Sequence, residues 1–252
     1  SNGILNATGG RQAAAIGGNN DRLTGNITIN SGVINATSGD FGAAIGDGDT
    51  VRTSNGGMLW TVGQTNSISK IVINGGEVWA IATTDTPGIG TADEFISGIN
   101  ATADVWTGME IEINGGSIVS VGGGEQYNPS SAIGAGSNTN LSSSNIVINI
   151  GTDENPTQII AVTQTKQGSF PVSNVGGSSI PALSTESSAS VLNIKFDSSK
   201  IASHLDFWYL VDPTYSTEPT TEFPNSILER MGDINVLGMA VVLPEGKYRV
   251  TQ

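Results

Sequence analysis

One short pattern recurs along this chain and limits the folds that it can adopt. Residues 111–122 read I-E-I-N-G-G-S-I-V-S-V-G, and residues 71–80 and 27–36 match them closely. Aliphatic residues alternate with period two on each side of an Asn-Gly-Gly or Asn-Ser-Gly centre, as they do in short strands with one buried face. Gly and Asn accept a positive φ at low cost, so this centre is predicted to be a tight turn.

Weaker copies of the unit lie between the strong ones. The second turn residue of each copy falls at Gly3, Gly32, Gly57, Gly76, Gly98, Gly116, Gly151, Gly177 and Ser199. The average step is about 25 residues, and one supersecondary unit at such a period is typical of a solenoid. A third short strand follows in four units, at residues 15–17, 44–46, 88–90 and 132–134.

Three short strands per unit predict an all-β fold, a right-handed parallel β-helix (a β-solenoid) of roughly 9–11 coils that stack about 4.8 Å apart. We expect residues 1–203 to form the repeats. Residues 204–252 lose the unit and are expected to form a non-repeat C-terminal cap or the last coils of the same domain. A cap is needed because an open solenoid end exposes unpaired strand edges.

The register of the unit predicts interior ladders and one turn ladder. The first interior ladder holds Ile29, Ile73, Ile113 and Ile148. The second holds Leu5, Ile34, Leu59, Val78, Ile99, Ile118, Ile159 and Ile201. Small residues two positions later let the narrow core close, namely Ala7, Ala36, Thr61, Ala80, Ala101, Ser120, Ala161 and Ser203. The side-chain amides of Asn30, Asn55, Asn74, Asn114 and Asn149 are expected to hydrogen-bond up the stack at a shared turn.

Units of the form I-x-I-N-G-G-x-I-x-A followed by A-I-G-G resemble repeats of large secreted and wall-attached bacterial surface proteins. Residues 3–18 and 27–48 match best, and copies run to about Ser203. The resemblance implies an extracellular, adhesin-like β-solenoid and supplies no catalytic residues. We therefore expect a non-catalytic adhesin or stalk module, a monomeric fragment of a larger secreted or cell wall-attached protein. Its expected partners are host or environmental glycans or surface proteins.

Composition excludes several other classes. A formal net charge of −13 argues against nucleic-acid binding, because such a chain cannot neutralise a row of phosphates. No apolar run approaches the roughly 18 residues that a transmembrane helix needs. The absence of Cys excludes disulfides, thiolate metal sites and Cys nucleophiles. No cofactor is expected, apart from the calcium ion considered below.

Outward aromatic residues suggest glycan binding as an alternative function. Trp60 and Trp79 occupy the same outward position of the unit, Trp106 lies close by in sequence, and Tyr127 follows in the next coil. Exposed rings beside Asn and Asp suit stacking against sugars. In the competing interpretation a loop covers this face and the rings serve only packing. If the two copies are adjacent coils, the Cα atoms of Trp60 and Trp79 lie about 5 Å apart.

Acidic residues suggest a calcium loop. Asp47 and Asp49 alternate in a Gly-rich stretch, and carboxylate oxygens are the ligands that Ca²⁺ prefers. The stretch lacks the downstream Glu of an EF-hand, so a plain acidic turn is the competing interpretation. Further acids that could join the same corner are Asp85, Asp93, Glu94 and Asp104.

A polysaccharide lyase or glycoside hydrolase is the least favoured alternative. Enzymes on parallel β-helices, such as pectin lyases and polygalacturonases, use two or three acids plus a Lys or Arg on one outward face. Here the outward positions are mainly Asn, Thr, Val and Trp, and the ten Lys and Arg residues are scattered. The single histidine, His204, lies in the non-repeat region. The sequence therefore favours a non-catalytic chain, and an enzyme stays open as the least favoured alternative.

Overall fold

The structure is a computed structural model of the 252-residue chain. It describes residues 3–19, 24–55, 58–59, 69–92, 94–97, 109–123, 130–136, 146–164, 175–176, 184, 186–195, 206–210, 221–222, 236–243 and 247–251. All regular secondary structure in these residues is β-strand. The predicted all-β class is therefore confirmed.

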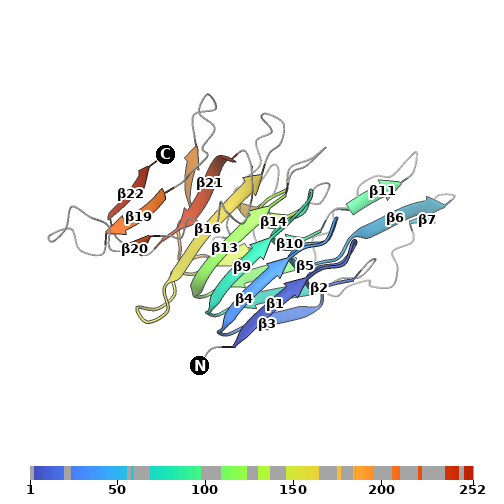
Figure 1. Ribbon diagram of the computed structural model, residues 1–252. Helices are drawn as coiled ribbons and strands as arrows, with labels where there is room; N and C mark the ends of the chain where they lie inside the picture. The colour runs from blue at the N-terminus through green and yellow to red at the C-terminus, as the bar shows by residue number, and fades with distance from the viewer. Residues whose placement is uncertain are drawn as a thin grey trace.

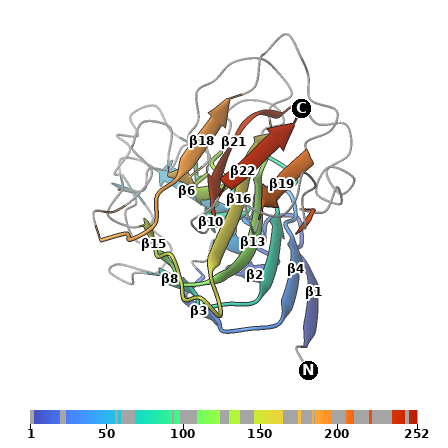
Figure 2. The same ribbon diagram turned by 90° about the vertical axis from the view of Figure 1, so that its left-hand side faces the viewer.

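Three sheets run along the length of the molecule, and successive coils add one short parallel strand to each (Figures 1 and 2). The first sheet holds β3 (Asn26–Ile29), β8 (Ser69–Ile73), β12 (Met109–Ile113) and β15 (Ile146–Ile148). The second sheet begins with β1 (Ile4–Thr8), β4 (Val33–Thr37), β9 (Glu77–Ile81), β13 (Gly116–Gly122) and β16 (Thr157–Gln164). The third sheet holds β2 (Ile16–Gly17), β5 (Ile45–Gly46), β10 (Ile89–Thr91), β14 (Ile133–Ala135) and β17 (Val175–Gly176).

Every pairing between these strands is parallel, which confirms the parallel β-helix. The coils are longer and fewer than the repeat spacing predicts. In the second sheet Leu5 is followed by Ile34, Val78, Ile118 and Ile159 as rung partners, so successive rungs are 29, 44, 40 and 41 residues apart. The described residues thus form five parallel rungs in this sheet, rather than the 9–11 coils expected.

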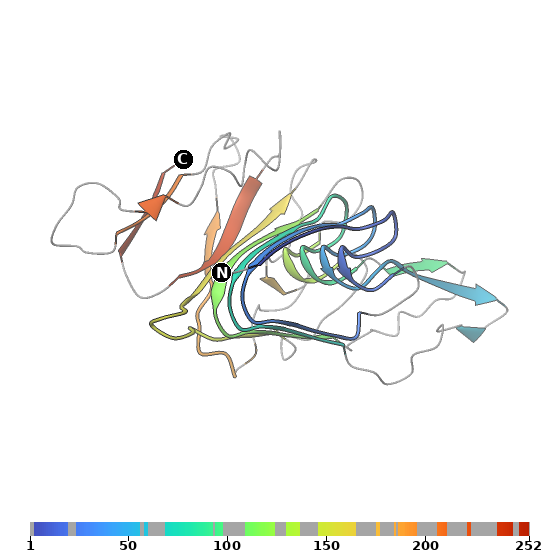
Figure 3. The same ribbon diagram turned by 60° about the horizontal axis from the view of Figure 1, so that its bottom comes forward.

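The sequence predicts the interior correctly wherever its copies fall on these rungs. Ile29, Ile73, Ile113 and Ile148 are rung partners and are buried. In the second sheet, Ala36, Ala80, Ser120 and Ala161 follow the aliphatic ladder as buried small residues. Figure 3 shows the coils nested around this narrow core. The small side chains lie next to the aliphatic side chains of the first two sheets. They leave room for the sheets to approach each other, so the core contains no wide gap.

Glycine is required within the strands of the third sheet. Gly46 and Gly90 are rung partners, and both adopt a φ of 144°. A Cβ atom built on Gly46 would overlap the carbonyl oxygen of Gly90, and one built on Gly90 would overlap that of Gly134. The backbones of successive coils approach too closely here for any side chain. The sequence Val175-Gly176, which looks like part of a loose copy of the turn, instead continues this ladder as β17.

One weaker copy of the unit does not form a coil. Asn55 ends β6 (Thr50–Asn55), and Leu59 ends β7 (Met58–Leu59), and these strands pair antiparallel as a hairpin. β6 also pairs in parallel with β11 (Glu94–Ser97), and the three strands lie beside the stack (Figure 1). Asn55 and Leu59 are therefore absent from the predicted ladders. The other expected ladder members, Thr61, Ile99, Ala101, Ile201 and Ser203, lie outside the described residues.

The C-terminal part of the chain closes one end of the second sheet. β21 (Val236–Val242) pairs antiparallel with β16, and β18 (Leu192–Lys195) pairs antiparallel with β21. A separate antiparallel sheet holds β19 (Asp206–Leu210), β20 (Thr221–Glu222) and β22 (Lys247–Thr251). Parallel stacking therefore ends at β16 in this sheet. The boundary between repeats and cap at residue 203 stays a prediction.

Candidate functional site

The outward row of the second sheet was the predicted position of the glycan-binding aromatics. Trp79 lies there, but its rung partners are Asn35 and Val119. The prediction that Trp60 is its neighbour in this row is therefore wrong. Trp79 is only 5% exposed, and its indole N–H donates a hydrogen bond to Oε1 of Glu77 at 2.7 Å. The ring therefore has no open face for a sugar.

The apolar side chains that follow Trp79 along the same face are buried too. They are Val119, Val121, Ile160, Val162 and Val241. These positions alternate with the interior ladder, so they point away from the solenoid core. The face is covered in these coils, as the packing interpretation expects. The other predicted aromatics, Trp60, Trp106 and Tyr127, lie outside the described residues, as does His204.

The two acids of the predicted calcium loop are both buried. Asp47 Oδ1 accepts a hydrogen bond from the Thr24 N–H at 2.8 Å. Asp49 Oδ2 accepts one from the Gln12 side-chain amide at 2.9 Å. Both acids therefore join the second coil to the preceding segment through N–H donors.

In the part of the chain that the structure describes, Asp47 and Asp49 do not belong to a larger acidic cluster. Within the described residues, no group of three or more acids or histidines could hold a metal ion. Among the other expected acids, Glu94 is the rung partner of Thr50, whereas Asp93 and Asp104 lie outside the description. Calcium binding by Asp47 and Asp49 stays a prediction, and a calorimetric titration with CaCl₂ tests it.

The buried carboxyl of Asp47 makes stability depend on pH. Burial raises the pKa of Asp47 from 3.8 to about 7, and the Thr24 hydrogen bond lowers it only in part. Between these values the folded state binds more protons than the unfolded state. The free energy of unfolding therefore falls as the pH rises from about 4 to about 7, by about 4 kcal/mol in all.

Asp47→Asn should remove this dependence and stabilise the chain at neutral pH by about 4 kcal/mol, because an amide carries no charge to desolvate. Urea unfolding of both proteins between about pH 4 and pH 8 measures the effect. Parallel pH profiles for Asp47→Asn and the wild type would contradict the argument.

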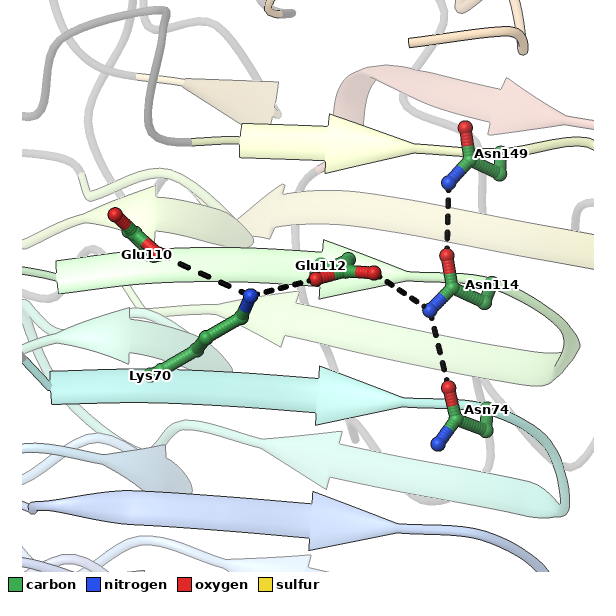
Figure 4. A network of polar contacts seen from close by, with 6 residues as sticks. All are labelled: Lys70, Asn74, Glu110, Glu112, Asn114 and Asn149. Carbon is green, nitrogen blue, oxygen red and sulfur yellow. Dashed lines mark hydrogen bonds and ion pairs between the residues drawn. The ribbon is translucent and has the colours of Figure 1, made fainter. Parts of the chain in front are cut away.

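The outer face of the first sheet carries an ionic network that sequence reasoning missed (Figure 4). Lys70 and Glu110 are rung partners on β8 and β12. Lys70 Nζ lies 2.7 Å from Oε2 of Glu112 and 3.9 Å from Oε2 of Glu110. Lys70 and Glu110 each stand one position before the first Ile of their unit. This shared position is the sequence signal from which their pairing could have been predicted.

Both principal members of this network are charged at neutral pH. The hydrogen bond from Lys70 lowers the pKa of Glu112, with a smaller contribution from the Asn114 amide 2.9 Å away. The hydrogen bond to Glu112 in turn raises the pKa of Lys70. A glycosidic general acid needs a raised carboxyl pKa, so Glu112 is poorly suited to that role.

An asparagine ladder lies at the end of the same face. Asn74 Nδ2 donates to Asn30 Oδ1 at 2.8 Å, Asn114 Nδ2 to Asn74 Oδ1 at 3.0 Å, and Asn149 Nδ2 to Asn114 Oδ1 at 2.7 Å. Asn155 Nδ2 also donates to the Asn74 carbonyl oxygen at 2.6 Å. The predicted ladder is confirmed without Asn55. The positive φ at this turn belongs to Gly32, Gly76 and Gly116 rather than to the asparagines.

Asn74→Ala should lower the free energy of unfolding by roughly 1–2 kcal/mol, because two ladder hydrogen bonds are lost. Chemical denaturation measures the change. Asn30→Ala, which removes only the bond to Asn74, should cost about half as much. Equal and negligible effects at both positions would show that the ladder contributes nothing to stability.

Comparison with known proteins supports the repeat and goes no further. A family model described as a beta helix repeat matches residues 1–20 and 27–49. These residues contain β1 to β5, apart from Asn26 at the start of β3. No curated protein and no solved structure gives a significant match. Within the described residues, no helix is long and apolar enough to traverse a bilayer.

Proposed function

We propose that this chain is a non-catalytic β-solenoid module of a secreted or wall-attached bacterial surface protein, acting as an adhesin or stalk. The observation that carries the proposal is the continuity of the ladders. Aliphatic, glycine and asparagine positions repeat from coil to coil, so each coil is bonded to its neighbour in all three sheets. A structure that contacts only its neighbours along one axis is suited to spacing or display.

The charged groups support a non-catalytic role. Lys70 neutralises Glu112 on the outer face, and Asp47 is buried between coils. Within the described residues these acids do not form a pair of carboxyls with opposed pKa shifts in one groove, which acid–base cleavage of a glycosidic bond requires. The resemblance of the repeat to bacterial surface proteins points in the same direction.

A screen of polysaccharide depolymerisation tests the non-catalytic part. The purified chain is incubated with neutral and acidic polysaccharides, and new reducing ends and unsaturated products are measured. We expect neither. Product formation that Glu112→Gln abolishes, and that Thr28→Ala on the same face leaves intact, would replace the proposal with an enzyme.

Glycan binding remains the second candidate, on a face different from the one predicted. The outer face of the first sheet presents Lys70, Glu112 and the asparagine ladder at the spacing of neighbouring strands, about 4.8 Å. Charged groups and amides at this spacing suit hydroxyl groups of an extended glycan. A glycan array compares the wild type with Lys70→Ala, and Lys247→Ala serves as a control away from this face. Binding lost only in Lys70→Ala would favour this candidate over a stalk.

A further inference from the structure

The corner between the first and second sheets places the same dipeptide, Asn-Gly, in two neighbouring coils. Asn74-Gly75 follows β8, and Asn114-Gly115 follows β12. The asparagines are needed for the ladder. A Cβ atom built on Gly75 or on Gly115 would overlap the side-chain amide of Asn155, which packs across both coils. The structure therefore leaves room only for glycine after each of these two asparagines.

An asparagine followed by glycine is chemically labile. The backbone nitrogen of the glycine can attack Cγ of the asparagine, because no side chain on the glycine stands in the way. A bond from this nitrogen to Cγ replaces the bond from Cγ to Nδ2, and the amide proton of the glycine leaves with Nδ2 as ammonia. Water then opens the resulting succinimide ring at either carbonyl, which gives aspartate or isoaspartate.

The folded corner restrains both reacting groups of Asn74-Gly75. Asn74 Nδ2 donates to Asn30 Oδ1 at 2.8 Å, and Asn74 Oδ1 accepts from Asn114 Nδ2 at 3.0 Å, so the amide points along the stack (Figure 4). Asn155 Nδ2 donates to the Asn74 carbonyl oxygen at 2.6 Å, and this carbonyl shares a peptide group with the Gly75 nitrogen. Departure of Nδ2 breaks the bond to Asn30, and rotation of the peptide group breaks the bond from Asn155.

The amide of Asn114 is restrained as well. Its Nδ2 donates to Oε1 of Glu112 at 2.9 Å in addition to Asn74 Oδ1. Its Oδ1 accepts from Asn149 Nδ2 at 2.7 Å. Departure of this Nδ2 would therefore break two hydrogen bonds, and the same kind of restraint operates in the neighbouring coil.

We propose that Asn74-Gly75 and Asn114-Gly115 are deamidation sites that the folded corner keeps closed and that become reactive when the corner opens. The modified chain would not rebuild the ladder. Aspartate at position 74 has no N–H to donate, so its carboxylate would face Asn30 Oδ1, acceptor against acceptor. Isoaspartate would also lengthen the main chain within a three-residue corner. Each molecule that opens for long enough is thus altered irreversibly.

The first experiment compares the folded and unfolded chains. The full chain is incubated at mildly alkaline pH, either in buffer or in guanidinium chloride. Tandem mass spectrometry of digests then measures the conversion at residues 74 and 114. We expect conversion at both positions to be at least about tenfold slower in the folded chain. Equal rates in the two conditions would overturn the proposal.

Single substitutions test whether these particular hydrogen bonds give the protection. Asn30→Ala removes the acceptor of Asn74 Nδ2, and Asn155→Ala frees the Asn74 carbonyl. Each should speed conversion at residue 74 in the folded chain about three- to tenfold. Asn6→Ala is the matched control, because Asn6 Oδ1 accepts a single side-chain bond, from Asn35 at 2.8 Å, in a ladder that does not include Asn74. Equal acceleration by Asn30→Ala and Asn6→Ala would overturn the proposal, because overall stability alone would then explain the protection.

A second pair of variants tests the consequence of conversion. Asn74→Asp reproduces the aspartate product and should lower the melting temperature by at least about 3 °C. Asn6→Asp is its control, because Asn6 only accepts in its ladder and a carboxylate still accepts from Asn35. Equal melting temperatures of the two variants would contradict the claim that the modified chain cannot rebuild the ladder. None of these readouts depends on whether the chain serves as an adhesin, a stalk or a glycan-binding module.

Discussion

Ile113→Asp should unfold the chain or lower its free energy of unfolding by more than about 5 kcal/mol. Ile113 lies in the middle of the first interior ladder, between Ile73 and Ile148, and is fully buried. The substitution removes an aliphatic side chain that fills the core and leaves a carboxylate with no charge partner in an apolar interior. Circular dichroism during thermal and urea unfolding measures the loss.

Thr28→Asp is the matched control on the same sheet. Thr28 precedes the ladder residue Ile29 in β3, points outward and is exposed. The new carboxylate stays in water there, so we expect a change within about 0.5 kcal/mol. Comparable losses at the two positions would mean that the strand register is displaced by one residue, because such a shift exchanges the inner and outer faces.

Gly90→Ala should be the second most damaging of these substitutions, with a loss of about 5 kcal/mol or a failure to fold. The new methyl group would overlap the carbonyl oxygen of Gly134 in the next coil, and the φ of 144° is one that side-chain-bearing residues rarely adopt. The coils could relieve the overlap only by separating, which would break the pairing of β10 with β14.

Gly25→Ala separates the two causes of this loss. Gly25 also has a positive φ, 72°, but a Cβ atom there would meet nothing within 4 Å. The variant should lose only about 1 kcal/mol, from backbone strain alone. Differential scanning calorimetry of both variants tests the distinction. Losses of equal size would show that backbone strain, rather than the close approach of coils, makes glycine necessary at Gly90.

The strand pattern predicts the interior because the requirement is local. Any coil must bury alternate residues on both sides of a tight turn. Units such as residues 111–122 show this alternation in their aliphatic positions. The coil length was mispredicted because the same short sequence pattern also occurs outside the coils. Asn55 and Leu59 flank a Gly-Gly sequence like that of the strong copies, yet their strands pair antiparallel as a hairpin. Turn residues specify a reversal of the chain and do not specify its distant pairing partner.

The functional features were harder to predict because each depends on residues from different coils. Lys70 and Glu110 meet because their strands are neighbours in the first sheet, although 40 positions separate them in the sequence. Asp47 is buried and accepts a hydrogen bond from Thr24, 23 positions earlier, and Trp79 is buried although it lies on an outward face. Alternation alone gives the direction of a side chain and says nothing about what lies beyond it.

The corners of the coil differ in how much the number of residues between strands varies. Between β3 and β4 and between β8 and β9 the corner has three residues, and the third sheet tolerates no side chain at its glycines. The path from the third sheet back to the first varies freely, from eight residues between β2 and β3 to 22 between β5 and β8, where the β6–β7 hairpin is inserted. This corner shows the widest range of lengths among the described strands, so new loops can be grafted there without repacking the interior. All such grafts would emerge along a single edge of the rod, where neighbouring loops could evolve into a composite recognition surface.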